Sequence, residues 1–143
     1  FDKGTQFRSR ELYMPVAALL MEEKEDEMAL EEARVADIPD LEGFHVGHID
    51  NYGNMKTTIP NSYMKGKFKY GDKVTVSVGN TEHEAYYVSN MFGKEPDVLV
   101  IAPGSSGMPD DPYLELIVWQ HMPLSSAKLF FPHALPGKEV KIK

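Results

Sequence analysis

The sequence predicts a mainly β protein: a small antiparallel β-barrel with an N-terminal helical segment and one short late helix. Short stretches alternate apolar and polar residues, most clearly residues 73–78 (KVTVSV). Turns that contain glycine or proline separate these stretches, for example at Gly79-Asn80. Helical spacing is confined to the start of the chain and to Leu124–Phe131, where Ser125 or Ser126 can cap a helix. A β-sandwich is the alternative architecture for such a pattern.

The amino-acid composition excludes several kinds of functional site. The chain has 143 residues, of which 42% are hydrophobic, and no cysteine. Disulfides, thiolate metal sites and Cys nucleophiles are therefore excluded, and we expect a cytoplasmic location. No apolar run approaches the ~20 residues that cross a bilayer, so no membrane partner is expected. The chain starts at Phe1 rather than Met, which we interpret as a fragment or a processed or trimmed form.

Charge divides the chain into two parts. Residues 1–43 hold 12 acidic and 5 basic side chains, whereas residues 44–143 hold 10 of each. We therefore place an acidic helix and linker at 1–42 and the compact barrel domain at 43–143. The second part lacks the basic excess that phosphate binding requires, so nucleic acid is not an expected partner.

The first element is a helix over 12–21. Ser9 is a suitable N-cap, Glu11 lies in the favoured acidic first turn, and Pro15 is tolerated near a helix start. One face carries the apolar residues Leu12, Val16, Leu19 and Leu20. Ser9 and Arg10 are alternatively anion ligands, because a first turn presents free N–H groups. Residues 22–32 are predicted to be a solvated acidic segment, and residues 33–43 a linker.

A strand, a tight turn and a second strand are expected over 44–59. The turn at 51–54 contains a glycine between residues that tolerate left-handed backbone. It carries the Asp50 carboxylate, the Tyr52 ring and the Asn54 amide, which can hold a small polar ligand. The alternative is a polar hairpin tip in which Asp and Asn bond their own backbone.

Further strands follow at 82–88, 97–102, 113–119 and 136–142. Residues 97–102 (DVLVIA) are a nearly continuous apolar run, which indicates a strand buried on both faces. The connector 103–107 (PGSSG) is a second candidate site, since Ser105, Ser106 and free N–H groups can cradle a carboxylate. The alternative is a flexible link between strands. Lysines at 65, 67 and 69 alternate with apolar residues and form either a nucleic-acid stripe or a solvated edge.

Standard catalytic motifs are absent. The five histidines have no metal-ligand spacing, and neither a Ser/His/Asp signature nor a phosphate-binding glycine motif occurs.

Three blocks nevertheless occur in a recognisable order. They are residues 7–18 (FRSRELYMPVAA), residues 49–59 (IDNYGNMKTTI), and residues 104–107 (GSSG) with 113–116 (YLEL) and 126–127 (SA). Together they resemble the C-terminal part of the S-adenosylmethionine hydroxide adenosyltransferase family, relatives of the fluorinating and chlorinating enzymes. The middle block resembles the family's Ile-Asp-x-Phe-Gly-Asn … Thr-Asn-Ile hallmark, with Thr58 where the family usually has Asn.

The resemblance implies a barrel that completes an S-adenosylmethionine pocket in a homotrimer, against the N-terminal domain of the same or another chain. The family converts S-adenosylmethionine and hydroxide to adenosine and methionine, with S-adenosylmethionine as substrate and no cofactor. By position, Asp50 would bind the methionine ammonium, Tyr52 would stack near adenine and Asn54 would bond the adenine edge. Ser105 or Ser106 would hold the methionine carboxylate, and Ser9 would lie near the nucleophile.

This sequence departs from the family in three places. Residues 1–42 would be the tail of the family's N-terminal α/β domain, and most of that catalytic domain is missing, so no catalytic residue is assigned and enzyme activity stays open. Residues 108–112 and 120–124 are inserted, in loops expected to face the ligand. The alternatives are a non-catalytic nucleoside-binding barrel and an unrelated barrel that binds single-stranded nucleic acid through Phe68 and Lys65–Lys73.

Overall fold

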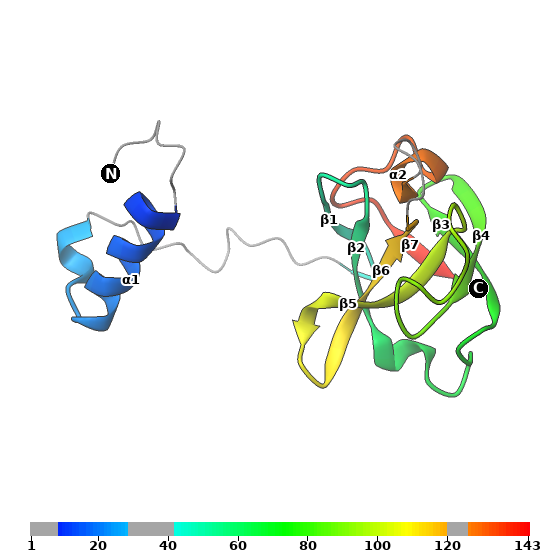
Figure 1. Cartoon of the computed structure of the whole chain (residues 1–143), viewed down its shortest axis with the longest axis horizontal. Helices are drawn as coiled ribbons and strands as arrows, with labels where there is room; N and C mark the ends of the chain where they lie inside the picture. Colours follow the sequence, from blue (N-terminus) through cyan, green and yellow to red (C-terminus); the bar gives the residue numbers. More distant parts are fainter. Residues whose placement is uncertain (1–8, 29–41, 120–125) are drawn as a thin grey trace. The chain divides into compact units, whose positions relative to one another are not determined.

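The computed structural model describes residues 9–28, 42–119 and 126–143, and the chain divides into two units, Phe1–Asp40 and Leu41–Lys143 (Figure 1). Parts of the linker expected at 33–43, the insertion at 120–124 and the Ser125 cap lie outside the described residues. Within the described ranges, no helix has the length and apolar character to cross a membrane. The prediction that the first unit is the tail of an α/β domain stays a prediction.

Residues 9–28, the described part of the first unit, are largely helical, but Ser9 does not cap α1. A π-helical turn, η1 (Ser9–Tyr13), leads into α1 (Met14–Met21), and η2 (Glu25–Met28) follows. The N-cap of α1 is Tyr13, which makes no side-chain cap hydrogen bond, with a proline in the first turn. Helical structure therefore begins at Ser9, but as a π-helical turn, and the α-helix itself starts at Met14. No residue of α1 is buried.

The second unit is a seven-stranded sheet. Its strands are β1 (Val46–Ile49), β2 (Met55–Pro60), β3 (Lys73–Val78), β4 (Thr81–Tyr87), β5 (Val100–Met108), β6 (Asp111–Ile117) and β7 (Val140–Ile142). They run in the order β1-β2-β6-β5-β4-β3-β7. A 3-10 turn, η4 (Asn61–Met64), follows β2, and α2 (Ala127–Phe130) precedes β7. The predicted mainly β barrel with one late helix is confirmed.

The two edge strands of this sheet meet and nearly close the barrel. His45 and Glu139 form an antiparallel bridge. The Val46 amide donates to the Lys138 carbonyl at 2.8 Å, and the Gly137 amide donates to the Val46 carbonyl at the same distance. Closure removes the exposed edges that an open sheet of this size would present.

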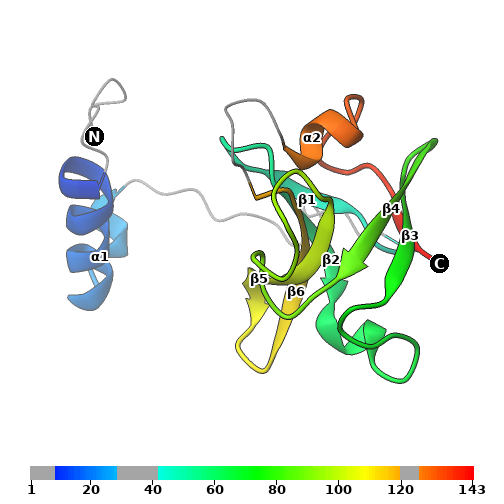
Figure 2. The same cartoon turned by 45° about the vertical axis from the view of Figure 1, so that its right-hand side comes forward.

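One neighbouring pair is parallel, so the barrel is not antiparallel throughout, whereas the sequence predicts an antiparallel barrel. Tyr86 and Tyr87 of β4 face Val100 and Ile101 of β5 in the same chain direction, whereas the other paired strands are antiparallel. A hairpin cannot make such a pair, so a crossover of about a dozen residues is needed, and residues 88–99 form it. Figures 1 and 2 show this connection looping outside the sheet between β4 and β5.

The connector expected at 103–107 is not a loop. It belongs to β5, which pairs with β6 from Val100 to Met108 with an irregular register between Pro103 and Gly107. Residues 108–112, expected as a loop facing the ligand, form the tip of the β5–β6 hairpin. Proline and glycine are tolerated here because the irregular register accommodates residues that cannot join a regular ladder.

The core fills the barrel and extends under the crossover. The largest fully buried side chains are Phe131, Met55, Ile59, Met64, Leu99, Ile101, Leu114 and Leu116. On the opposite face of β5 and β6, Val88, Val100, Ala102 and Ile117 form a second cluster. Residues 99–102 of the predicted strand are thus buried on both faces, whereas Asp97 is exposed, Val98 is half-buried and β5 starts only at Val100. Phe131 brings α2 onto one end of the barrel (Figure 2).

Candidate functional site

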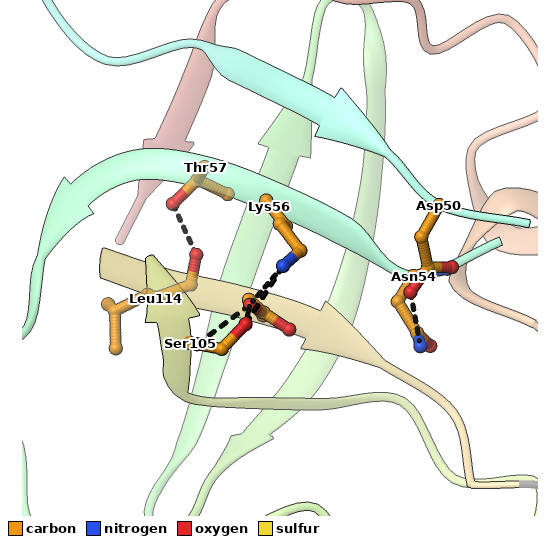
Figure 3. Close-up of polar contacts among 7 residues, drawn as sticks. Asp50, Asn54, Lys56, Thr57, Ser105 and Leu114 are labelled. Atoms are coloured by element: carbon orange, nitrogen blue, oxygen red, sulfur yellow. Dashed lines mark hydrogen bonds and ion pairs between the residues drawn. The ribbon is translucent and has the colours of Figure 1, made fainter. Parts of the chain in front are cut away.

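The β1–β2 turn is organised by Asp50. Its Oδ1 accepts the backbone N–H groups of Tyr52 and Asn54, both at 2.9 Å, and its Oδ2 accepts the Asn54 amide Nδ2 at 3.1 Å (Figure 3). Gly53 adopts a φ of 79°, which only glycine adopts readily, and its N–H donates to the Asp50 carbonyl. The carboxylate therefore closes the turn, and it also fixes which way the Asn54 amide faces.

The turn is held against α2. The Lys128 amide donates to the Gly53 carbonyl at 3.0 Å. A Cβ built on Gly53 would lie 2.7 Å from both Cβ and Oγ of Ser126, so the Gly53 backbone packs directly against the Ser126 side chain. This contact presents the side chains of the turn on a fixed frame.

Tyr52 and Asn54 line one cavity of about 380 Å³ with Met91, Val118 and Trp119. Tyr52 is 74% exposed, so its ring is available to a ligand. The Trp119 indole N–H donates to the Lys94 carbonyl at 2.8 Å, which ties the crossover to the cavity wall. The cavity thus combines two aromatic rings, apolar side chains and one amide, and its volume is typical of small-molecule sites.

Ser105 lies in a different arrangement, against a carboxylate of this chain. Its backbone N–H donates to Glu115 Oε1 at 3.0 Å, and its hydroxyl donates to the same oxygen at 3.3 Å. Lys56 donates to the Ser105 hydroxyl at 2.8 Å and pairs with Glu115 at 3.5 Å (Figure 3). The residue type expected to hold a ligand carboxylate therefore holds Glu115, which is only 8% exposed.

Gly104 makes room for this buried carboxylate. A Cβ at Gly104 would stand 2.3 Å from Glu115 Cγ and Oε1. Lys56 and Glu115 are also direct cross-strand partners of β2 and β6, which places their side chains on one face. Ser106 does not join the group: its hydroxyl is buried, without a hydrogen-bond partner within the structure described.

The structure therefore brings together three of the six predicted site residues: Asp50, Tyr52 and Asn54. Ser105 instead bonds Lys56 of β2, two residues after Asn54 in the chain. Ser106 joins neither group, and Ser9 belongs to the other unit.

Sequence reasoning missed Trp119, Met91, Lys56 and Glu115. A single charged residue inside the apolar run 114–118 was a signal for Glu115, because a buried carboxylate needs partners. Among the residues described, no group of three or more His, Asp or Glu side chains could hold a metal ion.

Comparison with known proteins adds a fold relationship. No protein-family model matches the chain, and no curated protein matches it. The crystal structure of an uncharacterized conserved protein from Thermotoga maritima is similar, with a TM-score of 0.61 and 24% sequence identity. The match covers 99% of this chain and 54% of that protein, so this chain spans about half of its length. At this identity the likeness shows the fold alone.

Proposed function

We propose that this chain is the nucleoside-binding C-terminal part of an enzyme that converts S-adenosylmethionine and hydroxide to adenosine and methionine. The observation that carries the proposal is the cavity shared by the Tyr52 ring, the Asn54 amide and the Trp119 ring. An aromatic wall with one oriented amide suits a planar base that presents both a donor and an acceptor.

The Asn54 amide has the polarity that adenine requires. One N–H of Asn54 is used by the Asp50 carboxylate, which can only accept. The amide oxygen and the second N–H are left for a ligand. Adenine offers an N6 donor next to a ring-nitrogen acceptor, so it can satisfy both groups at once. Asp50 thus acts on the base by orienting Asn54.

Fewer free groups are available to bind the methionine half of the substrate than to bind the adenine half. Asp50 already accepts three hydrogen bonds, which leaves about one of the four lone-pair directions of a carboxylate for an ammonium group. A methionine carboxylate would compete with Glu115 for the Ser105 donors. This half therefore rests on the order of the three sequence blocks, and a trimer and a cytoplasmic location are parts of the same proposal.

Catalysis is assigned to groups outside the described barrel. The solved structure with the same fold is almost twice as long as this chain, which leaves room for a further domain there. The alternative function, a non-catalytic nucleoside-binding module, uses the same cavity. Adding the family's N-terminal domain and measuring release of adenosine and methionine separates the two, since only the first predicts turnover.

Binding can be measured through Trp119, the only tryptophan of the chain. Adenosine and S-adenosylmethionine should each change its fluorescence on titration. Tyr52→Ala should weaken adenosine binding roughly tenfold, the value expected for one lost stacking contact. Tyr113→Ala is the matched control, because Tyr113 is also exposed but lines neither this cavity nor the one beside η4. Equal affinities for the two variants, or no binding of either ligand, would count against the proposal.

A further inference from the structure

A second cavity, of about 530 Å³, lies beside η4 and the tip of the β5–β6 hairpin. Its lining residues are Asn61, Ser62, Lys65, Phe68, Lys69, Tyr70, Tyr87, Asp110 and Asp111. Figures 1 and 2 both show η4 and the hairpin tip at the end of the barrel away from α2, whereas the β1–β2 turn contacts α2. The two cavities share no lining residue.

One wall of this cavity is a supported aromatic surface. The rings of Tyr70 and Tyr87 are 4.7 Å apart between centroids, and Tyr70 is 54% exposed. Tyr87 is buried, and its hydroxyl donates to Asn61 Oδ1 at 2.7 Å. Burial raises the pKa of Tyr87, so the phenol remains a donor in this bond. A fixed ring behind an exposed one leaves the exposed ring free to stack on a ligand.

The charged groups of the cavity differ in how far they are already paired. Within the part of the chain that the structure describes, the ammonium groups of Lys65 and Lys69 have no hydrogen bond, ion pair or ring contact. The Asp111 carboxylate accepts the Ser62 N–H at 2.8 Å and the Ser62 hydroxyl at 2.6 Å. Asp110 is the remaining acidic group of the lining.

Two neighbouring lysines, unlike Lys65 and Lys69, already have partners within the protein. Lys67 lies 3.4 Å from the centre of the Tyr63 ring, and Lys73 donates to Glu84 at 3.2 Å. The stripe of lysines therefore splits: the lysines at 67 and 73 are used within the protein, while those at 65 and 69 are left for a ligand. Two unpaired cations beside an exposed ring favour an anion attached to a flat ring.

We propose that this second cavity binds a planar base that carries a phosphate, with the base on Tyr70 and the phosphate between Lys65 and Lys69. The source is either a free nucleotide or one nucleotide of a single strand. Because the barrel part of the chain has equal numbers of acidic and basic residues, a strand gains little from the rest of the surface. We therefore expect a free nucleotide and an oligonucleotide to bind with similar affinity.

Amide-resolved NMR of the full chain tests this site separately from the Tyr52 cavity. The probes are adenosine, adenosine 5′-monophosphate and an adenine hexanucleotide. We expect the monophosphate to shift the amides of residues 61–70 and 110–111, and adenosine to leave them unchanged or to shift them only at much higher concentration. Amides around Tyr52 report on the first cavity in the same spectra, so failure of either proposal is visible by itself.

Variants then assign the contacts. Lys65→Gln with Lys69→Gln should weaken the monophosphate about tenfold at this cavity, as expected for two exposed ion pairs. Lys141→Gln is the control for the loss of one positive charge elsewhere, since Lys141 lies on β7 and lines neither cavity. Asp110→Asn should tighten binding about twofold, because it removes a carboxylate near the phosphate. All four side chains are exposed, so each variant should fold.

The following outcomes decide whether the second cavity binds a nucleotide. Monophosphate shifts at residues 61–70 that are lost in the double lysine variant support the site, and tighter hexanucleotide binding would identify a strand as its source. No shift of these amides with either phosphate probe would overturn the proposal. Weaker binding in Asp110→Asn would also overturn it, because the ligand would then carry a positive charge.

Discussion

Replacing Gly104 by alanine tests whether the Glu115 carboxylate is held where the structure has it. The new Cβ would stand 2.3 Å from Glu115 Cγ and Oε1 and 2.4 Å from Cδ, far closer than carbon atoms approach. Glu115 is 8% exposed and lies on the barrel between β2 and β5. The side chain must therefore move and leave its partners.

The expected loss follows from those partners. Moving the carboxylate breaks the 3.0 Å bond from the Ser105 N–H and the 3.5 Å contact with Lys56. A hydrogen bond to a charged group contributes about 1.5–3 kcal/mol, and the smaller backbone entropy of alanine returns about 0.5 kcal/mol. We expect Gly104→Ala to lower the free energy of unfolding by about 2 kcal/mol, or the melting temperature by roughly 10 °C.

Urea denaturation followed by Trp119 fluorescence measures this loss. Gly47→Ala is the matched control: its new Cβ would meet the nearest atom at an ordinary 3.6 Å, and we expect a change within about 0.5 kcal/mol. A double-mutant cycle with Glu115→Ala isolates the cause, since Gly104→Ala should cost almost nothing once the carboxylate is gone. An equal cost in both backgrounds would refute the reasoning.

The remaining predictions concern other parts of the barrel. Gly53→Ala should destabilise by about 1–3 kcal/mol, because it needs a φ of 79° and meets Ser126 at 2.7 Å; calorimetry measures the loss, and no change would contradict the contact with α2. Phe131→Ala should cost about 3–5 kcal/mol in urea denaturation, since the ring is 1% exposed; less than 1 kcal/mol would mean that α2 is not docked. Two hydrogen bonds lower the pKa of Asp111 in the folded chain: the larger effect comes from the Ser62 hydroxyl and the smaller from the Ser62 N–H. As pH falls, Asp111 is therefore protonated in the unfolded chain before it is protonated in the folded chain. The stability that the Asp111 carboxylate contributes is complete above the ordinary pKa of 3.8 and is lost as pH falls through the lower folded pKa. Asp111→Asn should remove that acid-side slope in stability measured against pH.

Local sequence patterns predicted most of the barrel because each strand depends on neighbours in the chain. The alternation in 73–78 puts Val74, Val76 and Val78 inside, and Gly79-Asn80 then supplies the two-residue turn to β4. The β1–β2 turn followed the same logic: the polar hairpin tip is observed, and ligand binding by the turn stays a prediction. Asp50 bonds its own backbone, while Tyr52 and Asn54 still line a cavity.

Among the predictions that differed from the structure, one depends on residues distant in sequence and one on a local helical turn. Residues 103–107 contain the proline, glycine and serine of a loop, but pairing with β6 makes them a strand. Ser9 was a plausible cap, yet the π-helical turn places Tyr13 at the start of α1. In each case a contact or a turn outside the local pattern outweighed residue preference.

The sequence by itself determined most of the strands, the β3–β4 turn and the placement of Asp50, Tyr52 and Asn54 on one turn, because these follow from nearest-neighbour chemistry. Only the tertiary structure decided which groups meet across the barrel. It placed Trp119 and Tyr52 on the wall of one cavity, and it paired the Ser105 hydrogen-bond donors with the Glu115 carboxylate of the neighbouring strand β6. Such pairings are set by register and by the closure of the sheet, and a one-residue shift would change every partner, so no local pattern encodes them.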